Sequence, residues 1–420
     1  MNQPPDPFQF LKNLWGPMGL PPAGVMAPTL GQDEIERRIA ELKSVENWLN
    51  MNLNVLRATL HGLEMQKSGL AAMREAGVMG PLSGNSILEF VNRGEAMPKA
   101  IRIQQQGGPE VLKWEDVQVG DPGPGEARVR HKACGLNFLD VYQRSGLYKI
   151  TLPSGMGNEG AGVVEAVGSG VTQVKAGDRV AYAGGAPGAY SEVRTMPVDR
   201  LVVLPEGISF ETAAAMMLKG MTAQYLLRRT YKVQSGETVL FHATAGGVGL
   251  IACQWLKALG ATVIGTAGSE EKCALARAHG AHHCINYRTE NFVERVKALT
   301  GGKGVPVVYD SVGKDTFTGS LDCLQPRGLM VSFGNSSGAV PAFELGVLSQ
   351  KGSLYVTRPT LVTHTSKRED LVATAKDLFD VVLSGKVKIE VNHRYPLKDA
   401  AQAHRDLEAR KTTGSTILIP

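Results

Sequence analysis

The strand, turn and helix pattern of residues 238–260 constrains the fold of this chain more than any other feature. Residues 238–242 read as a buried strand, residues 243–249 as a glycine-rich turn, and the helix that follows is ended by Gly260. A pyrophosphate can approach the N–H groups at the start of such a helix only where side chains are small. Thr244 departs from the usual G-x-G-x-x-G pattern. The segment predicts a dinucleotide site, with a tight turn that binds no ligand as the alternative.

Alternating strands and helices continue downstream of the turn. Further strands are predicted at residues 262–266, 283–286, 305–310 and 329–334, with helical segments between them. This alternation is typical of a doubly wound parallel sheet. The chain is therefore predicted to contain an α/β domain of the Rossmann type.

The end of the second predicted strand bears on the choice of cofactor. Ala267 stands where an NAD enzyme usually has Asp or Glu for the ribose 2′-hydroxyl. Lys272 follows on the next helix and could pair with a 2′-phosphate, which favours NADPH. A charge-assisted bond of roughly 1.5–3 kcal/mol gives a preference of about one to two decades in affinity. Alternatively, Lys272 is a solvated helix residue beside Glu270 and Glu271.

Composition limits the classes of protein that fit. The 420 residues suggest two to three domains. The chain is 43% hydrophobic but has no apolar run of about 20 residues, so no membrane span is predicted. Without the features of a signal peptide, a cytoplasmic location is expected. A net charge of +5 spread along the chain does not imply nucleic acid. Five scattered cysteines are expected to be reduced thiols: Cys134, Cys253, Cys273, Cys284 and Cys323.

The composition of the sequence changes near Met97. Before it the pattern is helical and linker-like, and after it the pattern is β-rich with frequent glycine. Four predicted regions follow from this change and from the Rossmann pattern. They are a helical segment at 1–76, a linker at 77–96, a β-rich substrate domain formed by 97–220 and 361–420, and a Rossmann NADPH-binding domain at 221–360.

Residues 97–420 resemble the zinc-free quinone oxidoreductases of the medium-chain dehydrogenase/reductase superfamily, the zeta-crystallin group. The matching runs are Gly-Gly-Pro-Glu at 107–110, Leu-Asn-Phe-Leu-Asp at 136–140, Leu-Lys-Gly-Met-Thr at 218–222, Gly-Gly-Val-Gly at 246–249, Val-Tyr-Asp-Ser-Val-Gly at 308–313 and Ser-Phe-Gly-Asn at 332–335. The resemblance implies a GroES-like fold for the β-rich domain and reduction of quinones by NADPH.

The resemblance also makes two asparagines informative. Zinc enzymes of this superfamily have a Cys ligand where Asn137 stands and a His ligand where Asn158 stands, and Cys134 lies three residues from the first position. A zinc site needs three or four N, S or O ligands in tetrahedral reach. The resemblance therefore implies metal-independent chemistry on an electrophilic substrate.

Specific residues receive roles by the same resemblance. Asn137 and Tyr142 are implied to lie over the nicotinamide and the substrate, with Tyr142 positioning or protonating the reduced oxygen; packing against Arg144 and Tyr148 is its alternative role. The implied cofactor-binding residues are Thr222, Gly246, Gly247, Val248, Ser269, Lys272, Tyr287, Phe333, Gly334, Asn335 and Arg410. Four histidines show no pattern of a catalytic triad and are interpreted as structural or surface residues: His131, His242, His282 and His283.

The front of the chain carries a heptad pattern. Apolar residues recur at every seventh position: Ile35, Leu42, Leu49, Leu56, Leu63 and Leu70. Such a seam predicts one long helix that pairs as a coiled coil. We therefore expect a homo-oligomer, in the simplest case a dimer.

Residues 8–75 resemble the phasin-like proteins associated with polyhydroxyalkanoate granules. This likeness implies binding to a polyester granule or to a polymer synthase, with packing of Phe10 to Trp15 on the reductase as the alternative. The junction near Met97 fits either a true fusion or two genes read as one.

Three functions agree with these observations. The first is NADPH-dependent reduction of quinones, metal-independent and attached to a granule-binding or oligomerising helix. The second is reduction of enones or alkenals on the same scaffold. The third is a structural role in coating granules.

Overall fold

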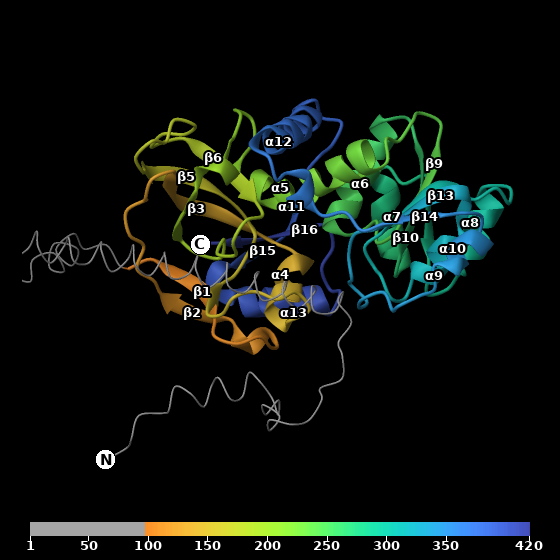
Figure 1. Cartoon of the computed structure of the whole chain (residues 1–420), viewed down its shortest axis with the longest axis horizontal. Coiled ribbons are helices and arrows are strands. Elements are labelled where there is room, and N and C mark those ends of the chain that lie inside the picture. Colours follow the sequence, from red (N-terminus) through yellow and green to blue (C-terminus); the bar gives the residue numbers. More distant parts are fainter. Residues whose placement is uncertain (1–96) are drawn as a thin grey trace, which may run out of the picture. The chain divides into compact units, whose positions relative to one another are not determined.

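The computed structural model describes residues 97–420, which form one compact unit of two lobes (Figure 1). The predicted helical segment at 1–76, the linker at 77–96 and the heptad seam lie outside the described residues. Among residues 97–420, no helix is long and apolar enough to cross a membrane.

The first lobe contains a six-stranded sheet in the order β11-β10-β9-β12-β13-β14. Every pair of neighbours in it is parallel. The strands are β9 (Thr238–Phe241), β10 (Thr262–Ala267), β11 (His283–Asn286), β12 (Val305–Asp310), β13 (Leu324–Ser332) and β14 (Tyr355–Thr357). The helices between them are α6 (Gly247–Ala258), α7 (Glu270–Ala278), α8 (Phe292–Leu299), α9 (Phe317–Asp322) and α10 (Gly346–Gln350). This arrangement confirms the predicted parallel Rossmann sheet.

Two details of this sheet differ from the prediction. The fifth strand spans Leu324–Ser332 and not residues 329–334, and a sixth strand, β14, was not predicted. β14 has three residues and lies at the sheet edge, where Tyr355 is 60% exposed. A short edge strand with little buried surface leaves almost no hydrophobic signal in a sequence.

The second lobe is built on a seven-stranded sheet in the order β15-β16-β3-β5-β6-β8, with β7 paired to β3. A smaller sheet has the order β2-β1-β4. The larger sheet consists of β3 (Glu126–Leu136), β5 (Glu159–Val167), β6 (Arg179–Ala183), β7 (Val193–Pro197), β8 (Val202–Val203), β15 (Val391–Pro396) and β16 (Ser415–Ile419). The smaller sheet consists of β1 (Lys99–Ile103), β2 (Lys113–Asp116) and β4 (Ser154–Gly155). As predicted, the end of the chain rejoins this lobe, because β16 pairs with β3.

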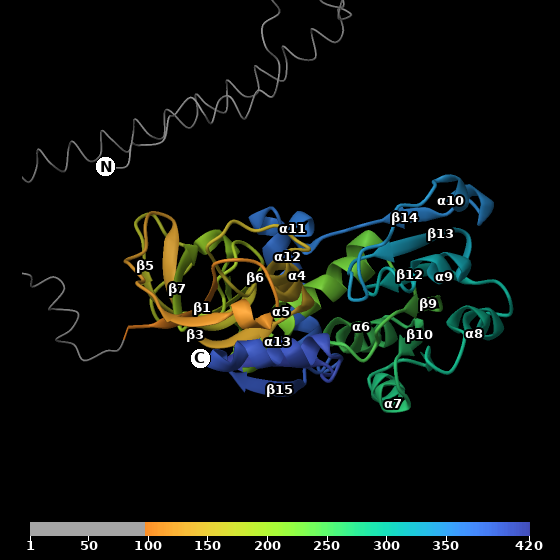
Figure 2. The same cartoon turned by 90° about the horizontal axis from the view of Figure 1, so that it is seen from below.

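Helix α5 (Phe210–Tyr225) joins the two lobes and lies between them in both views (Figures 1 and 2). Ser209 caps it by accepting a hydrogen bond from the Thr212 N–H at 3.1 Å. The helix contacts β3 of one lobe and α6 of the other, and the predicted domain boundary at 221 falls inside it. The largest hydrophobic cluster is likewise shared, since Ala161 of β5 and Val239 of β9 both belong to it.

Four further helices complete the second lobe. They are α4 (Phe138–Ser145), α11 (Leu361–His364), α12 (Arg368–Leu383) and α13 (Ala400–Glu408). α12 packs on α5, and α13 packs on α4.

Candidate active site

The glycine turn lies between β9 and the first residue of α6. Ala243 has a left-handed φ of 55°, and its carbonyl accepts from the Gly246 N–H at 3.0 Å. A Cβ on Gly249 would lie 2.5 Å from that same carbonyl oxygen, so only glycine fits. The N–H groups of the first turn of α6 have no partners within the helix. The turn is therefore shaped to receive an anion at the carboxyl end of a parallel strand.

Basic side chains gather at the carboxyl ends of β10 and β11. Ser269 caps α7 by accepting from the Lys272 N–H at 3.3 Å, and the Lys272 ammonium donates to the Arg410 carbonyl at 2.8 Å. Burial and the charges of Arg288 and Arg410 lower the pKa of Lys272. Close by, a Cβ on Gly268 would lie 2.6 Å from the Tyr287 hydroxyl and 3.7 Å from Arg288 Nε.

This arrangement brings together Ser269, Lys272, Tyr287 and Arg410. Within residues 97–420, Lys272, Arg288 and Arg410 form no ion pair with a carboxylate. The nearby Glu270 pairs with Arg277 instead. Like charges crowded in this way favour an anionic ligand between them. Arg288 was not predicted, although its place directly after Tyr287 at the end of a strand was a usable signal.

Asn137 lies at the junction of β3 and α4, where it is buried. Its backbone N–H donates to Asp140 Oδ2 at 2.8 Å, and its side-chain Nδ2 donates to Glu159 Oε2 at 2.8 Å. Glu159 is the first residue of β5 and is fully buried. The Asn137 side chain is thus held in place by a carboxylate from a neighbouring strand.

Asn158, which the resemblance places at the second zinc position, is also hydrogen-bonded. Its Nδ2 donates to Asp140 Oδ1 at 2.7 Å and to Gln143 Oε1 at 2.6 Å. Burial raises the pKa of Asp140 to about 6, against the opposing effect of its hydrogen bonds to Asn158 and Tyr190. In the part of the chain that the structure describes, no group of three His, Cys, Asp or Glu side chains is placed to hold a metal ion. The asparagines belong to a hydrogen-bonded network of amides and carboxylates.

Tyr142 of α4 reaches the other lobe. Its hydroxyl oxygen accepts a hydrogen bond from the Asn335 N–H at 3.1 Å, and its ring lies 5.2 Å from that of Tyr148. Burial raises the pKa of Tyr142 to about 12, so the hydroxyl keeps its proton at neutral pH. The Tyr148 hydroxyl in turn accepts from Arg358 Nη2 at 3.0 Å.

The remaining predicted residues lie in two places. Phe333, Gly334 and Asn335 follow the carboxyl end of β13, and the Phe333 ring lies 5.8 Å from that of Phe241 at the end of β9. Thr222 is buried in α5. The structure therefore brings Tyr142 to Asn335, and it brings Ser269, Lys272, Tyr287 and Arg410 together at a separate place beside α7.

Sequence reasoning missed the aromatic and basic residues around Tyr142. Arg358 donates to Ser332 Oγ at 3.0 Å and to the Gly334 carbonyl at 2.9 Å. Tyr225 stacks on His364 with ring centroids 4.5 Å apart. These residues come from α5 and from the segment after β14, and nothing in their local sequence indicates that they meet.

The histidine interpretation agrees with the structure for the buried pair. His131 Nε2 lies 2.7 Å from the Tyr182 hydroxyl, and His242 lies between Thr266 and Ser320 at 2.9 and 3.0 Å. Burial lowers the pKa of both imidazoles, to about 3 for His131.

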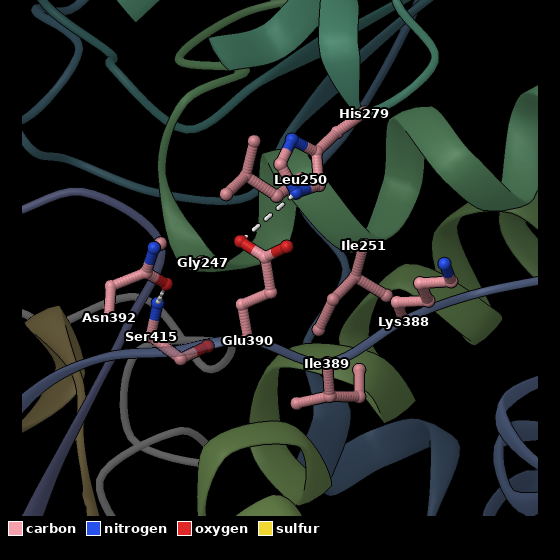
Figure 3. A pocket seen from close by; sticks show the side chains of 10 residues that line it. Gly247, Leu250, Ile251, His279, Lys388, Ile389, Glu390, Asn392 and Ser415 are labelled. Atoms are coloured by element: carbon pink, nitrogen blue, oxygen red, sulfur yellow. Dashed lines mark hydrogen bonds and ion pairs between the residues drawn. The ribbon is translucent and has the colours of Figure 1, made fainter.

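A small pocket lies beside the first turns of α6 and is shown in Figure 3. It is lined by Gly247, Leu250, Ile251, His279, Lys388, Ile389, Glu390, Asn392, Gly414 and Ser415. His279 Nε2 lies 3.3 Å from Glu390 Oε2, and Asn392 accepts from the Ser415 N–H at 3.0 Å. Gly247 is the only predicted site residue among these lining residues, so we do not place a substrate in the pocket.

A glycine turn at the carboxyl edge of a parallel sheet, joined through α5 to a β-rich lobe with Asn137 and Tyr142, defines a two-lobed dehydrogenase or reductase of the medium-chain type. Two family models match the chain accordingly. The alcohol dehydrogenase GroES-like domain matches residues 123–206, and the zinc-binding dehydrogenase model matches residues 247–378.

Similar proteins identify the family within this class of dehydrogenases and reductases. A quinone oxidoreductase of Pseudomonas aeruginosa is 60% identical over 325 residues, covering 77% of this chain and 100% of that protein. A 2-haloacrylate reductase of a Burkholderia species is 47% identical over 77% of this chain and 99% of that protein. The crystal structure of Escherichia coli quinone oxidoreductase complexed with NADPH is 56% identical, with a TM-score of 0.76 over 77% of this chain and 100% of that one. The chain belongs to the quinone oxidoreductase family of the medium-chain dehydrogenase/reductase superfamily and is an oxidoreductase.

Proposed function

We propose that the protein reduces quinones with NADPH as the hydride donor. The observation that carries this proposal is the set of anion-binding features along one sheet edge. They are the N–H groups of the first turn of α6, which have no partners within the helix, and the cluster of Lys272, Arg288 and Arg410. Their order along the edge suits a pyrophosphate followed by a 2′-phosphate. The solved relative that contains NADPH supports the same cofactor.

The residues present fit this cofactor at both ends. Gly246, Gly247 and Val248 would hold the pyrophosphate, and Ser269, Lys272, Tyr287 and Arg410 would surround the 2′-phosphate. Thr222, Phe333, Gly334 and Asn335 would line the nicotinamide half, next to Asn137. When bound, NADPH supplies a hydride. The remaining contribution of the protein is to place the electron acceptor and to supply a proton.

Tyr142 is the proposed proton donor or positioning group. Because its hydroxyl oxygen accepts from the Asn335 N–H, its own proton is free to point toward a substrate oxygen. With its pKa raised to about 12, Tyr142 stays neutral and can stabilise the negative charge that develops on that oxygen after hydride transfer. A quinone is electrophilic enough to accept hydride with this help alone, which agrees with asparagine at both zinc positions.

A second candidate is reduction of an activated alkene. The relative named 2-haloacrylate reductase favours it. In this chain Arg358, whose guanidinium lies beside Tyr148, could pair with a carboxylate on such a substrate. The proposed site is the same for both reactions, and only the acceptor differs.

The deciding experiment follows the absorbance of reduced nicotinamide with a simple quinone, with 2-haloacrylate and with a conjugated enone. NADH and a metal chelator are tested in parallel. Fast, chelator-resistant turnover of the quinone with a preference for NADPH supports the proposal. Turnover of the alkenes alone would favour the second candidate, and binding of NADPH without any turnover would favour the structural role.

We also propose that residues 8–75 bind a polyhydroxyalkanoate granule or polymer synthase and assist homo-oligomer formation. The resemblance to phasin-like proteins and the heptad pattern support this proposal. Co-sedimentation of the full chain with polyester particles, together with its molar mass in solution, tests both points. A mass spectrum of the native protein that shows only a species starting at Met97 would refute the fusion.

A further inference from the structure

A buried ion pair lies between Asn137 and the first turn of α6. Lys219 Nζ and Glu159 Oε2 are 3.1 Å apart, and the side chains are 6% and 0% exposed. Glu159 begins β5 in the GroES-like lobe, and Lys219 belongs to α5, which joins the lobes.

The Glu159 carboxylate is fixed by three donors. Oε2 accepts from Lys219 and from Asn137 Nδ2, whereas Oε1 accepts from the Leu218 N–H at 2.7 Å. One backbone group and one ammonium therefore hold the carboxylate that in turn holds the Asn137 amide.

The methylene chain of Lys219 extends this line of contacts to the first turn of α6, where the pyrophosphate is proposed to bind. A Cβ on Gly247, the first residue of α6, would lie 2.6 Å from Lys219 Cδ and 2.9 Å from Cε. The Lys219 methylenes thus occupy the space that a side chain at 247 would need. A continuous line of contacts runs from the first turn of α6 through Lys219 and Glu159 to Asn137.

Stability alone does not account for this pair. Replacing a buried ion pair by uncharged groups of similar volume is often neutral or stabilising, because both charges lose their hydration on folding. The position of the pair is the informative feature, since its two ends contact the two parts of the proposed cofactor site.

We propose that Glu159 and Lys219 are positioning residues that fix Asn137 relative to the phosphate-binding turn. The inference rests on the proposed function, because it assigns the nicotinamide end of NADPH to Asn137 and the pyrophosphate to α6. The pair sets the spacing between these two ends. Hydride transfer depends steeply on that spacing, and a misplacement of about 1 Å can cost roughly a hundredfold in rate.

The test is the double variant Glu159→Gln/Lys219→Met, which removes both charges and keeps an unbranched stem over Gly247. We expect kcat with NADPH and a quinone to fall by about tenfold to a hundredfold. The unfolding temperature should stay the same or rise, and the NADPH dissociation constant should change less than kcat. Because a buried double substitution can prevent folding, Glu159→Gln alone is measured beside it with the same expectation for kcat.

A mutant cycle with Asn137→Ala separates positioning from general structural support. If the pair acts through Asn137, adding Asn137→Ala to the double variant causes no further loss of kcat, so the effects are not additive. The matched control is Asp322→Asn/Lys351→Met, which removes a partly exposed Lys–Asp pair of the Rossmann lobe and should leave kcat unchanged.

Three results would overturn the inference: unchanged kcat in the double variant, additive effects with Asn137→Ala, or loss of stability with full activity per folded molecule. Failure of the wild type to reduce quinones would refute the proposed function separately. In that case the positioning role is tested by the fluorescence of bound NADPH, which depends on the environment of the nicotinamide. A change on removing the pair supports the positioning role, whereas an identical spectrum, or no binding of NADPH to the wild type, rejects it.

Discussion

Replacing Lys272 by alanine tests the proposed cofactor preference at a single side chain. The Lys272 ammonium donates to the Arg410 carbonyl at 2.8 Å and lies near the charges of Arg288 and Arg410, which lower its pKa. The substitution keeps the Ser269 cap, because that hydrogen bond uses the backbone N–H of residue 272. The loss should therefore be confined to the ammonium.

The magnitude follows from the bond that is lost. A charge-assisted hydrogen bond to a 2′-phosphate contributes roughly 1.5–3 kcal/mol, which corresponds to about one to two decades in affinity. Two cations of the cluster remain in the variant, so we expect a loss nearer one decade for NADPH. NADH lacks the 2′-phosphate, and its affinity should barely change.

The assay is a titration of cofactor fluorescence for NADPH and NADH on the wild type, on Lys272→Ala and on Lys303→Ala. Lys303 is exposed in the turn after α8 and serves as the matched control. Equal losses for both cofactors in Lys272→Ala would refute the 2′-phosphate role, as would a loss of the same size in Lys303→Ala.

Three further predictions concern the site and its support. Tyr142→Phe should lower kcat by about a hundredfold with little change in NADPH affinity, and an unchanged kcat in steady-state assays would reject Tyr142 as donor. Gly249→Ala should destabilise the protein by more than about 2 kcal/mol and abolish NADPH binding, since its Cβ would lie 2.5 Å from a carbonyl oxygen; denaturant unfolding measures this. Burial lowers the pKa of His131 and His404 to about 3 and raises that of Asp140 to about 6. As pH falls below 6.5, these two imidazoles take up protons in the unfolded chain, whereas Asp140 takes up one in the folded chain. Burial also lowers the pKa of His242, so the free energy of unfolding should drop by at least about 1.4 kcal/mol per unit near pH 5. Stability that is flat across this window would contradict that account.

The sequence predicts the Rossmann lobe well because its central strands are buried on both faces. Runs such as residues 238–241 and 305–310 are almost wholly apolar and are bounded by glycine, which leaves a strong local signal. The edge strand β14 carries no such signal. The shared helix α5 is also missed as a junction, since a pattern along one helix does not show which two lobes it touches.

The candidate site can be predicted where its residues directly follow a strand. Ser269, Lys272 and Asn335 stand just after the ends of predicted strands, where ligands of parallel sheets bind. Arg358 and the pair of Glu159 and Lys219 are different, because their partners lie far away in sequence. The hydrogen bond between Tyr148 and Arg358 joins residues 210 positions apart, and only the folded chain brings them together.

The strand order of the GroES-like sheet has a consequence for protein synthesis. β16, at Ser415–Ile419, lies inside this sheet between β15 and β3, whereas all six strands of the Rossmann sheet are found between residues 238 and 357. A growing chain can therefore close the Rossmann sheet first, while residues 134–136 at the end of β3 keep an open edge until residues 415–419 have been made. The lobe that begins to emerge first from the ribosome is the last to be completed, and its exposed edge is where a chaperone would be needed.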